Sequence, residues 1–136
     1  MKISLQKKIS SKDKVLIYPI FTEKKKPLAG TVQKKIKNIL DRLVKSETFK
    51  AGECETYTVD PYVTGLPQHI IFIGLGEKEK IKRAVVRNAI AVAVKEAKKL
   101  KHKTATLMVI PEIEKYPKTI GESIGMVNYI LAKFKT

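Results

Sequence analysis

Apolar residues recur along the chain in two rhythms, and these rhythms predict alternating strands and helices. Short runs that are nearly all apolar, or that alternate with polar residues, predict strands over residues 2–9, 15–21, 54–59, 69–73 and 104–110. Apolar residues at three- and four-residue spacing predict helices over residues 31–45, 79–101 and 119–132. Because helices separate several strands, we expect an α/β fold, a three-layer α/β/α sandwich on a mixed, largely parallel sheet.

Two local features add detail to this outline. Pro19 lies inside the apolar run at 15–21 and has no N–H group, so the strand should end, bulge or lose a partner there. Residues 22–30 are mostly polar and include three consecutive lysines, which is typical of an exposed loop. Strands that follow one another without an intervening helix can pair antiparallel, which would make the sheet mixed.

The run at 69–73 leads into a Gly-Leu-Gly segment at residues 74–76, and the longest helical pattern follows. We interpret this as a buried strand, a tight turn and the start of a helix. Dinucleotide-binding loops have a third glycine three residues further on, where this chain has Glu79. Glu79 and Glu77 would repel a pyrophosphate, so a structural turn capped by acids is favoured over a nucleotide loop.

A net charge of +15, from 28 basic and 13 acidic residues, invites a nucleic-acid partner. The alternative is an ordinary solvated surface, since only three of the basic residues are arginines and no aromatic residues are interleaved with them. Basic residues share one face of the predicted helix over 79–101 and form a candidate nucleic-acid or partner surface: Lys80, Arg83, Arg87, Lys95, Lys98 and Lys101. A solvated outer face accounts for the same pattern and is favoured.

No set of residues with catalytic spacing is present in the sequence. Cys54 is the single cysteine, and it is interpreted as a small half-buried residue rather than a nucleophile. His69 and His102 lack metal-ligand spacing to another His, Cys or carboxylate. Residues 1–10 lack the apolar core of a signal peptide, and no stretch is apolar enough to span a bilayer. We therefore expect a cytoplasmic, non-membrane domain without a catalytic, metal or cofactor site of its own.

Three segments together point to a family. Residues 14–21, Lys-Val-Leu-Ile-Tyr-Pro-Ile-Phe, form a strand that ends in Pro-x-Phe. Residues 71–78, Ile-Phe-Ile-Gly-Leu-Gly-Glu-Lys, precede a predicted long helix and are similar to a Val-Gly-Leu-Gly-Lys segment. Residues 121–135, Gly-Glu-Ser-Ile-Gly-Met-Val-Asn-Tyr-Ile-Leu-Ala-Lys-Phe-Lys, are similar to a Glu-Gly-x-x-x-Gly-x-Tyr-x-Phe-x-x-Tyr-Lys ending, although residues 133–135 do not keep its second aromatic spacing. In this order, the segments resemble the N-terminal domain of the leucyl (cytosol) aminopeptidases, which has a macro-domain-like fold.

The resemblance implies that residues 1–136 are a single non-catalytic domain, cut off before the catalytic one. In the family, a C-terminal domain removes N-terminal amino acids from peptides and holds two divalent metal ions, zinc or manganese. Its Asn-Thr-Asp-Ala-Glu-Gly-Arg signature is absent here, so no catalytic residue carries over to this chain. The implied partners are that catalytic domain of the same polypeptide and the neighbouring subunits of a homo-oligomer, a hexamer in the family. The implied role is to shape and assemble the oligomer.

Two alternatives remain open beside this one. The first is a DNA- or RNA-binding module that uses the basic face of the 79–101 helix, because some relatives use this domain in DNA binding. The second is a macro-like nucleotide or ADP-ribose binder at the strand ends, against which Glu77 and Glu79 argue.

Overall fold

The computed structural model describes residues 2–7, 13–23, 26–28 and 34–127. Its strands are β1 (Lys2–Gln6), β2 (Val15–Glu23), β3 (Lys26–Leu28), β4 (Thr56–Val59), β5 (His69–Glu77) and β6 (Thr104–Met108). Its helices are α1 (Lys34–Lys45), the 3-10 turn η1 (Lys78–Lys80), α2 (Arg83–Lys99), α3 (Pro111–Glu114) and α4 (Pro117–Val127). Each predicted strand and helix is present, with different bounds, and the last residues of the helix predicted over 119–132 lie outside the described residues.

The strands form one mixed sheet in the order β1-β6-β2-β5-β4, with β3 paired to β2. The pairs β1–β6, β6–β2 and β2–β5 are parallel, whereas β4–β5 and β2–β3 are antiparallel. The two strands nearest the N-terminus are not neighbours, because β6 from the far end of the chain lies between them. The loop predicted over 22–30 also contains β3, which closes a hairpin with the end of β2. Parallel strands need helical crossovers, and this fixes the layered fold.

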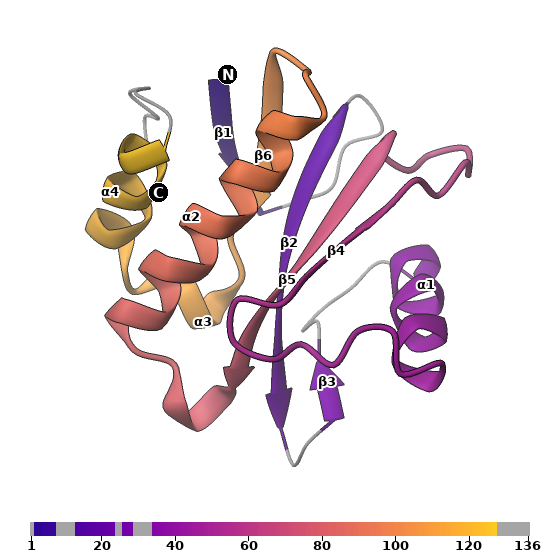
Figure 1. The fold of residues 1–136 in the computed structure, drawn as a ribbon, viewed down its shortest axis with the longest axis horizontal. Coiled ribbons are helices and arrows are strands. Elements are labelled where there is room, and N and C mark those ends of the chain that lie inside the picture. The colour runs from indigo at the N-terminus through magenta and orange to yellow at the C-terminus, as the bar shows by residue number, and fades with distance from the viewer. Residues whose placement is uncertain (1, 8–12, 24–25, 29–33, 128–136) are drawn as a thin grey trace.

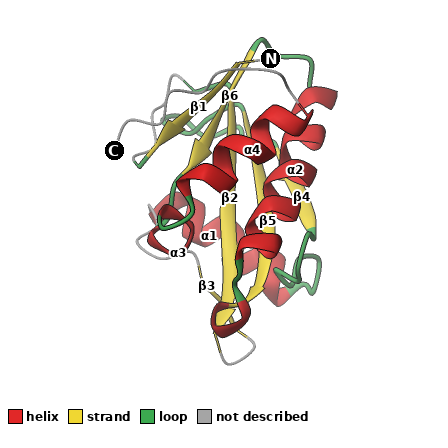
Figure 2. Cartoon of the chain, turned by 90° about the vertical axis from the view of Figure 1, so that its left-hand side faces the viewer, coloured by secondary structure: helices red, strands yellow, loops and turns green. Residues whose placement is uncertain are grey.

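The sheet lies between two helical layers (Figures 1 and 2). α2 and α4 pack against each other on one face, and α1 lies on the other (Figure 1). α2 packs on β5 and β2 through its small and branched face, which includes Val86, Ala89, Ile90, Ala93, Val94 and Ala97. The three-layer α/β/α prediction is confirmed.

The central strands are buried from both sides. Residues 15–21 of β2 and 70–75 of β5 are buried along their whole length, which explains their continuous apolar sequences. Each fully buried Ile or Phe side chain contributes about 1.5–3 kcal/mol through removal of apolar area from water. Pro19 pairs with Ile73 of β5, and the pairing register shifts between Ile20 and Thr22. β6 accompanies β2 only at Leu16 and Ile17, so the bulge and the lost partner occur beside the proline, as predicted.

The Gly-Leu-Gly segment is not the predicted tight turn. β5 continues through it to Glu77, because the backbone before β4 lies against the strand end. A Cβ atom on Gly74 would lie 2.0 Å from the carbonyl oxygen of Gly52. The Gly74 N–H donates to the Glu55 carbonyl at 2.7 Å, and the Gly76 N–H donates to the Ala51 carbonyl at 3.0 Å. Gly74 is therefore required by this close backbone crossing, which involves residues far from it in sequence.

The long helix begins later and ends earlier than its apolar pattern indicates. η1 and two extended residues precede α2, which spans Arg83–Lys99 instead of 79–101. Lys101 has a φ of 59°, so the chain has left the helix by that residue. Glu77 precedes η1 but its side chain makes no capping hydrogen bond, so the predicted acid cap is also wrong.

Candidate functional site

The basic face predicted from sequence is exposed, but only part of it lies on a helix. Arg83, Arg87, Lys95 and Lys98 lie on α2, whereas Lys80 belongs to η1 and Lys101 follows the helix. Each of the six side chains is exposed. Within the described residues, the one ion pair among them joins Lys80 to Glu77, with Nζ and Oε2 3.7 Å apart.

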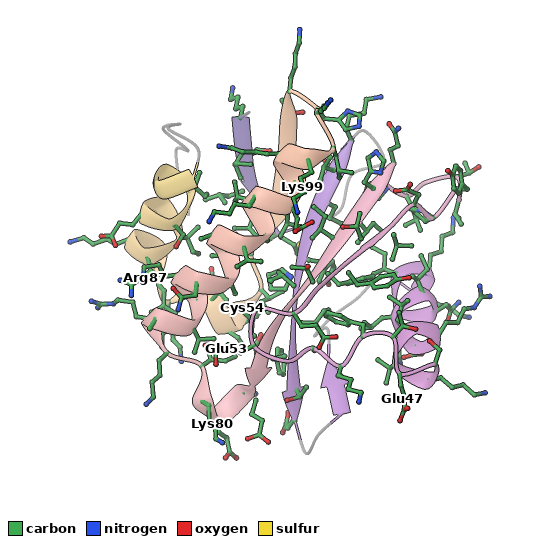
Figure 3. All side chains as sticks on the ribbon, in the orientation of Figure 1. Glu47, Glu53, Cys54, Lys80, Arg87 and Lys99 are labelled. Carbon is green, nitrogen blue, oxygen red and sulfur yellow. The ribbon has the colours of Figure 1, made fainter. Side chains whose placement is uncertain are left out.

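The six residues extend along the full length of α2. In Figure 3, Lys80 lies below the start of the helix, Arg87 projects from its first half, and Lys99 marks its other end. Lys99 itself pairs with Glu96 at 2.9 Å, so the far end of the helix is partly neutralised. The arrangement is an extended basic strip rather than a compact pocket. Such a strip suits a long polyanion better than a small ligand.

A cavity of about 440 Å³, here called the sheet-end cavity, opens where β2 and β5 end. It is lined by Thr22, Val44, Glu47, Phe49, Lys50, Ala51, Gly52, Gly76 and Glu77. Ligands of parallel α/β folds commonly bind at this edge of the sheet. Two carboxylates, Glu47 and Glu77, face a single lysine there, so the lining repels a phosphate group. The acidic character predicted from Glu77 thus argues against a nucleotide in this cavity.

The loop of the sheet-end cavity is held by a carboxylate. Glu55 accepts hydrogen bonds from the backbone N–H groups of Lys50 (3.1 and 3.2 Å) and Gly52 (3.0 Å). Glu47 and Ala51 both have positive φ angles, of 57° and 56°. Non-glycine residues rarely adopt this conformation, and the contacts with Glu55 and with β5 keep the chain there.

Cys54 lies in the same loop, and it is half-buried, in agreement with the sequence interpretation. Its backbone N–H donates to the Gly74 carbonyl at 2.9 Å. Burial raises the pKa of the Cys54 thiol, and the negative charge of neighbouring Glu53 raises it further. A raised pKa keeps the sulfur protonated and lowers its reactivity, which is the opposite of what a catalytic nucleophile needs.

The two histidines, isolated in sequence, lie together at the opposite edge of the sheet. Their ring centroids are 5.1 Å apart. The Nδ1 atom of His69 contacts the Asp60 carboxylate, at the base of a loop that carries Tyr62, which is 94% exposed. Among the described residues, no three His, Cys, Asp or Glu side chains are placed to hold a metal ion. His69 therefore holds one end of this loop through its contact with Asp60.

A second cavity at the carboxyl edge of the sheet was missed from sequence. It measures about 380 Å³ and is lined by Arg83, Lys115, Tyr116, Pro117, Lys118, Thr119 and Glu122. We call it the helix-start cavity, because its residues come from the first turn of α2, the first two turns of α4 and the residues just before α4. Lys115 and Lys118 could not be predicted from the sequence, since nothing there indicates that their segment meets the start of α2.

The fold defines the chain as macrodomain-like. It is similar to the macrodomain of Mycobacterium tuberculosis DarG, with a TM-score of 0.64 over 96% of this chain and 94% of that chain. Sequence identity is 9%, so the likeness concerns the fold alone.

The sequence identifies the family within that fold class. The model of the cytosol aminopeptidase family, N-terminal domain, matches residues 17–136. This chain therefore belongs to the cytosol aminopeptidase family and represents its N-terminal domain. The resemblance inferred from the three sequence segments is confirmed.

Curated relatives show how much of a family member this chain represents. The probable cytosol aminopeptidase of Clostridium perfringens is 29% identical over 125 residues, which cover 89% of this chain and 24% of that protein. That of Protochlamydia amoebophila is 29% identical over 128 residues, covering 90% and 25%. The chain spans about a quarter of the length of the relatives that it matches. The catalytic domain of the family lies elsewhere in those proteins. In the described part of this chain, no helix is long and apolar enough to cross a membrane.

Proposed function

We propose that this chain is the non-catalytic N-terminal domain of a longer, metal-dependent cytoplasmic aminopeptidase that removes N-terminal amino acids from peptides. The observation that carries the proposal is the family match over residues 17–136, on a chain that spans about a quarter of its relatives. Two divalent ions, zinc or manganese, would belong to the catalytic domain, as the resemblance to the family implies. The domain would contribute to shaping and assembling a homo-oligomer, a hexamer in the family.

The test uses the natural reading frame that contains this chain. We expect the full-length product to hydrolyse leucine p-nitroanilide when supplied with zinc or manganese, and the 136-residue chain to be inactive. Mass photometry of both proteins measures assembly: the full-length protein should form a hexamer. A reading frame without a catalytic domain after Thr136 would overturn the proposal, and so would an active 136-residue chain.

The exposed basic strip on α2 favours a second candidate function, binding of DNA or RNA. Its four helical cations, Arg83, Arg87, Lys95 and Lys98, are exposed along the same helix. Binding through such a strip should weaken steeply with salt, because each phosphate contact releases counterions.

A charge-matched pair of variants tests this second function. Lys95→Gln with Lys98→Gln removes two charges from α2, and Lys37→Gln with Lys45→Gln removes two exposed charges from α1. We expect gel shifts with a short DNA duplex at low salt to weaken for the α2 variant alone. Equal losses in both variants would show attraction by overall charge, and no gel shift at low salt would end this candidate.

A further inference from the structure

The helix-start cavity brings two helix N-termini to one place. α2 follows β5, and α4 follows β6 through the short α3, while β5 and β6 both run parallel to β2. The carboxyl ends of the parallel strands meet at one edge, so both helices begin there. α4 also packs against α2, as Figure 1 shows. Arg83 of α2 and Lys118 of α4 accordingly line the same cavity.

Neither helix start carries the capping or acidic side chains that normally accept hydrogen bonds from its first backbone N–H groups. The first helical hydrogen bonds are Val86 N–H to the Lys82 carbonyl (3.1 Å) and Ile120 N–H to the Tyr116 carbonyl (3.0 Å). The preceding N–H groups therefore have no intrahelical acceptor. Lys82, the N-cap of α2, makes no side-chain capping bond, and neither helix has an acidic residue in its first turn. Two uncapped helix starts present partial positive charge with nothing negative in their first turns to offset it.

The buried hydroxyl of Thr119 points independently to a ligand. Thr119 is 3% exposed and lines the cavity. Within the described residues, its hydroxyl makes no hydrogen bond, whereas buried Thr106 and Ser123 are both bonded. The Thr119 hydroxyl oxygen is also reachable by solvent. Among the described residues, the side-chain atom that is both fully enclosed and without a hydrogen bond is Oε1 of Glu112, not the Thr119 oxygen. A buried hydroxyl that opens into a cavity can donate a hydrogen bond to a molecule placed there.

Charged side chains complete the arrangement. Arg83, Lys115 and Lys118 supply three cations against one carboxylate, Glu122. The Lys115 Nζ atom lies 5.6 Å from the centroid of the Tyr116 ring, a cation–π contact that positions the ammonium group beside the cavity. Arginine suits this role because its planar group can donate two hydrogen bonds to one oxyanion.

We propose that the helix-start cavity binds a small phosphate-bearing molecule, with the phosphate held by Arg83, Lys118, the Thr119 hydroxyl and the free N–H groups of the two helix starts. A volume of about 380 Å³ exceeds what inorganic phosphate fills and lies in the range of small-molecule sites. A phosphate monoester of a small polar molecule therefore fits better than the free ion. Glu122 can then accept a hydrogen bond from a hydroxyl of the esterified group. This site is independent of the aminopeptidase assignment.

The test titrates the ¹⁵N-labelled 136-residue chain with inorganic phosphate, ribose 5-phosphate and a short DNA duplex at constant ionic strength, followed by NMR. We expect saturable shifts of the amides of residues 83–85 and 118–119, with ribose 5-phosphate binding more tightly than phosphate. Linear shifts spread over all lysines would overturn the proposal. Saturation by the duplex at these amides, without saturation by either small anion, would also overturn it.

Variants separate the site from the general positive charge. Arg83→Gln and Thr119→Val should each weaken ribose 5-phosphate binding about tenfold, through loss of a hydrogen bond to a charged group. Thr119→Ser keeps the hydroxyl and should bind within about twofold of the parent chain. Lys98→Gln removes the same charge as Arg83→Gln from the far end of α2 and should leave binding unchanged. Equal weakening by Lys98→Gln, or full binding by Thr119→Val, would contradict the proposed site.

Discussion

The sheet-end cavity and the helix-start cavity lie along the same edge of the sheet, yet they present opposite chemistry. The first is closed by a loop whose backbone donors are already taken by Glu55, and its rim carries Glu47 and Glu77. The second leaves backbone donors free and surrounds them with three cations. The comparison shows that a position at the carboxyl ends of parallel strands does not by itself make an anion site. What decides is whether the backbone N–H groups at the cavity are still free and which charges face them.

The largest expected effect tests whether the loop that lines the sheet-end cavity, residues 46–55 and here called the sheet-end loop, is fixed by its backbone contact with β5. Gly74→Ala places a Cβ atom 2.0 Å from the Gly52 carbonyl oxygen, so the loop must separate from β5. We expect a loss of about 3 kcal/mol in the free energy of unfolding, measured with urea. Gly121→Ala is the control, because nothing in the described structure lies within 4 Å of its added Cβ. It should gain up to about 1 kcal/mol from helix propensity. Equal stability of the two variants would show that the close contact between Gly74 and the sheet-end loop does not fix that loop.

The next effect tests the donors that Glu55 occupies. Glu55→Ala leaves the N–H groups of Lys50 and Gly52 without their carboxylate acceptor. We expect the free energy of unfolding to fall by about 2 kcal/mol. Glu53→Ala removes the same charge from an exposed neighbour and should change it by less than about 0.5 kcal/mol. If Glu55→Ala left the free energy of unfolding unchanged, the loop would be ordered by its contacts with β5 alone.

A smaller effect sharpens the contrast in charge. Glu122→Gln removes the single carboxylate from the helix-start cavity, so affinity for inorganic phosphate should rise about threefold through reduced repulsion. Glu77→Gln makes the same change beside the sheet-end cavity and should leave phosphate affinity unchanged. Calorimetric titration at constant ionic strength measures both. A rise in the Glu77→Gln variant alone would reverse the assignment of the two cavities.

The smallest effect concerns Cys54 in the sheet-end loop. Since Glu53 contributes to the raised pKa of the thiol, Glu53→Gln should lower that pKa and increase the fraction of thiolate at pH 8. Iodoacetamide should then alkylate Cys54 about twofold faster, while both proteins react more slowly than an unfolded cysteine peptide. For either protein the rate should rise with pH through the thiol pKa. A parent chain that reacts as fast as the peptide would show that the loop does not protect Cys54.

Much of the fold was predictable because each core element has a local pattern. The continuous apolar runs of β2 and β5 indicate strands buried on both faces, and Pro19 correctly marks the place where β2 bulges. The role of the Gly-Leu-Gly segment could not be predicted, because a glycine required by close packing is indistinguishable in sequence from a glycine required by a turn. The partner that needs Gly74 to be small lies at residues 51–52.

The candidate sites were less predictable. The basic strip was predictable because four of its six residues recur at helical spacing on α2. The helix-start cavity was not visible, because Arg83 and Lys118 are brought together only when α4 packs beside α2. The contacts between His69, His102 and Asp60 were hidden for the same reason.

By itself, the sequence determined the α/β class, the buried central strands, the exposed basic strip and the family, because each rests on local periodicity or on ordered motifs. Only the tertiary structure decided the strand order, with β6 inserted between β1 and β2, and the joining of two helix starts into one cavity. The physical reason is that pairing and packing between distant segments depend on the complementarity of whole surfaces, which no single stretch of residues encodes.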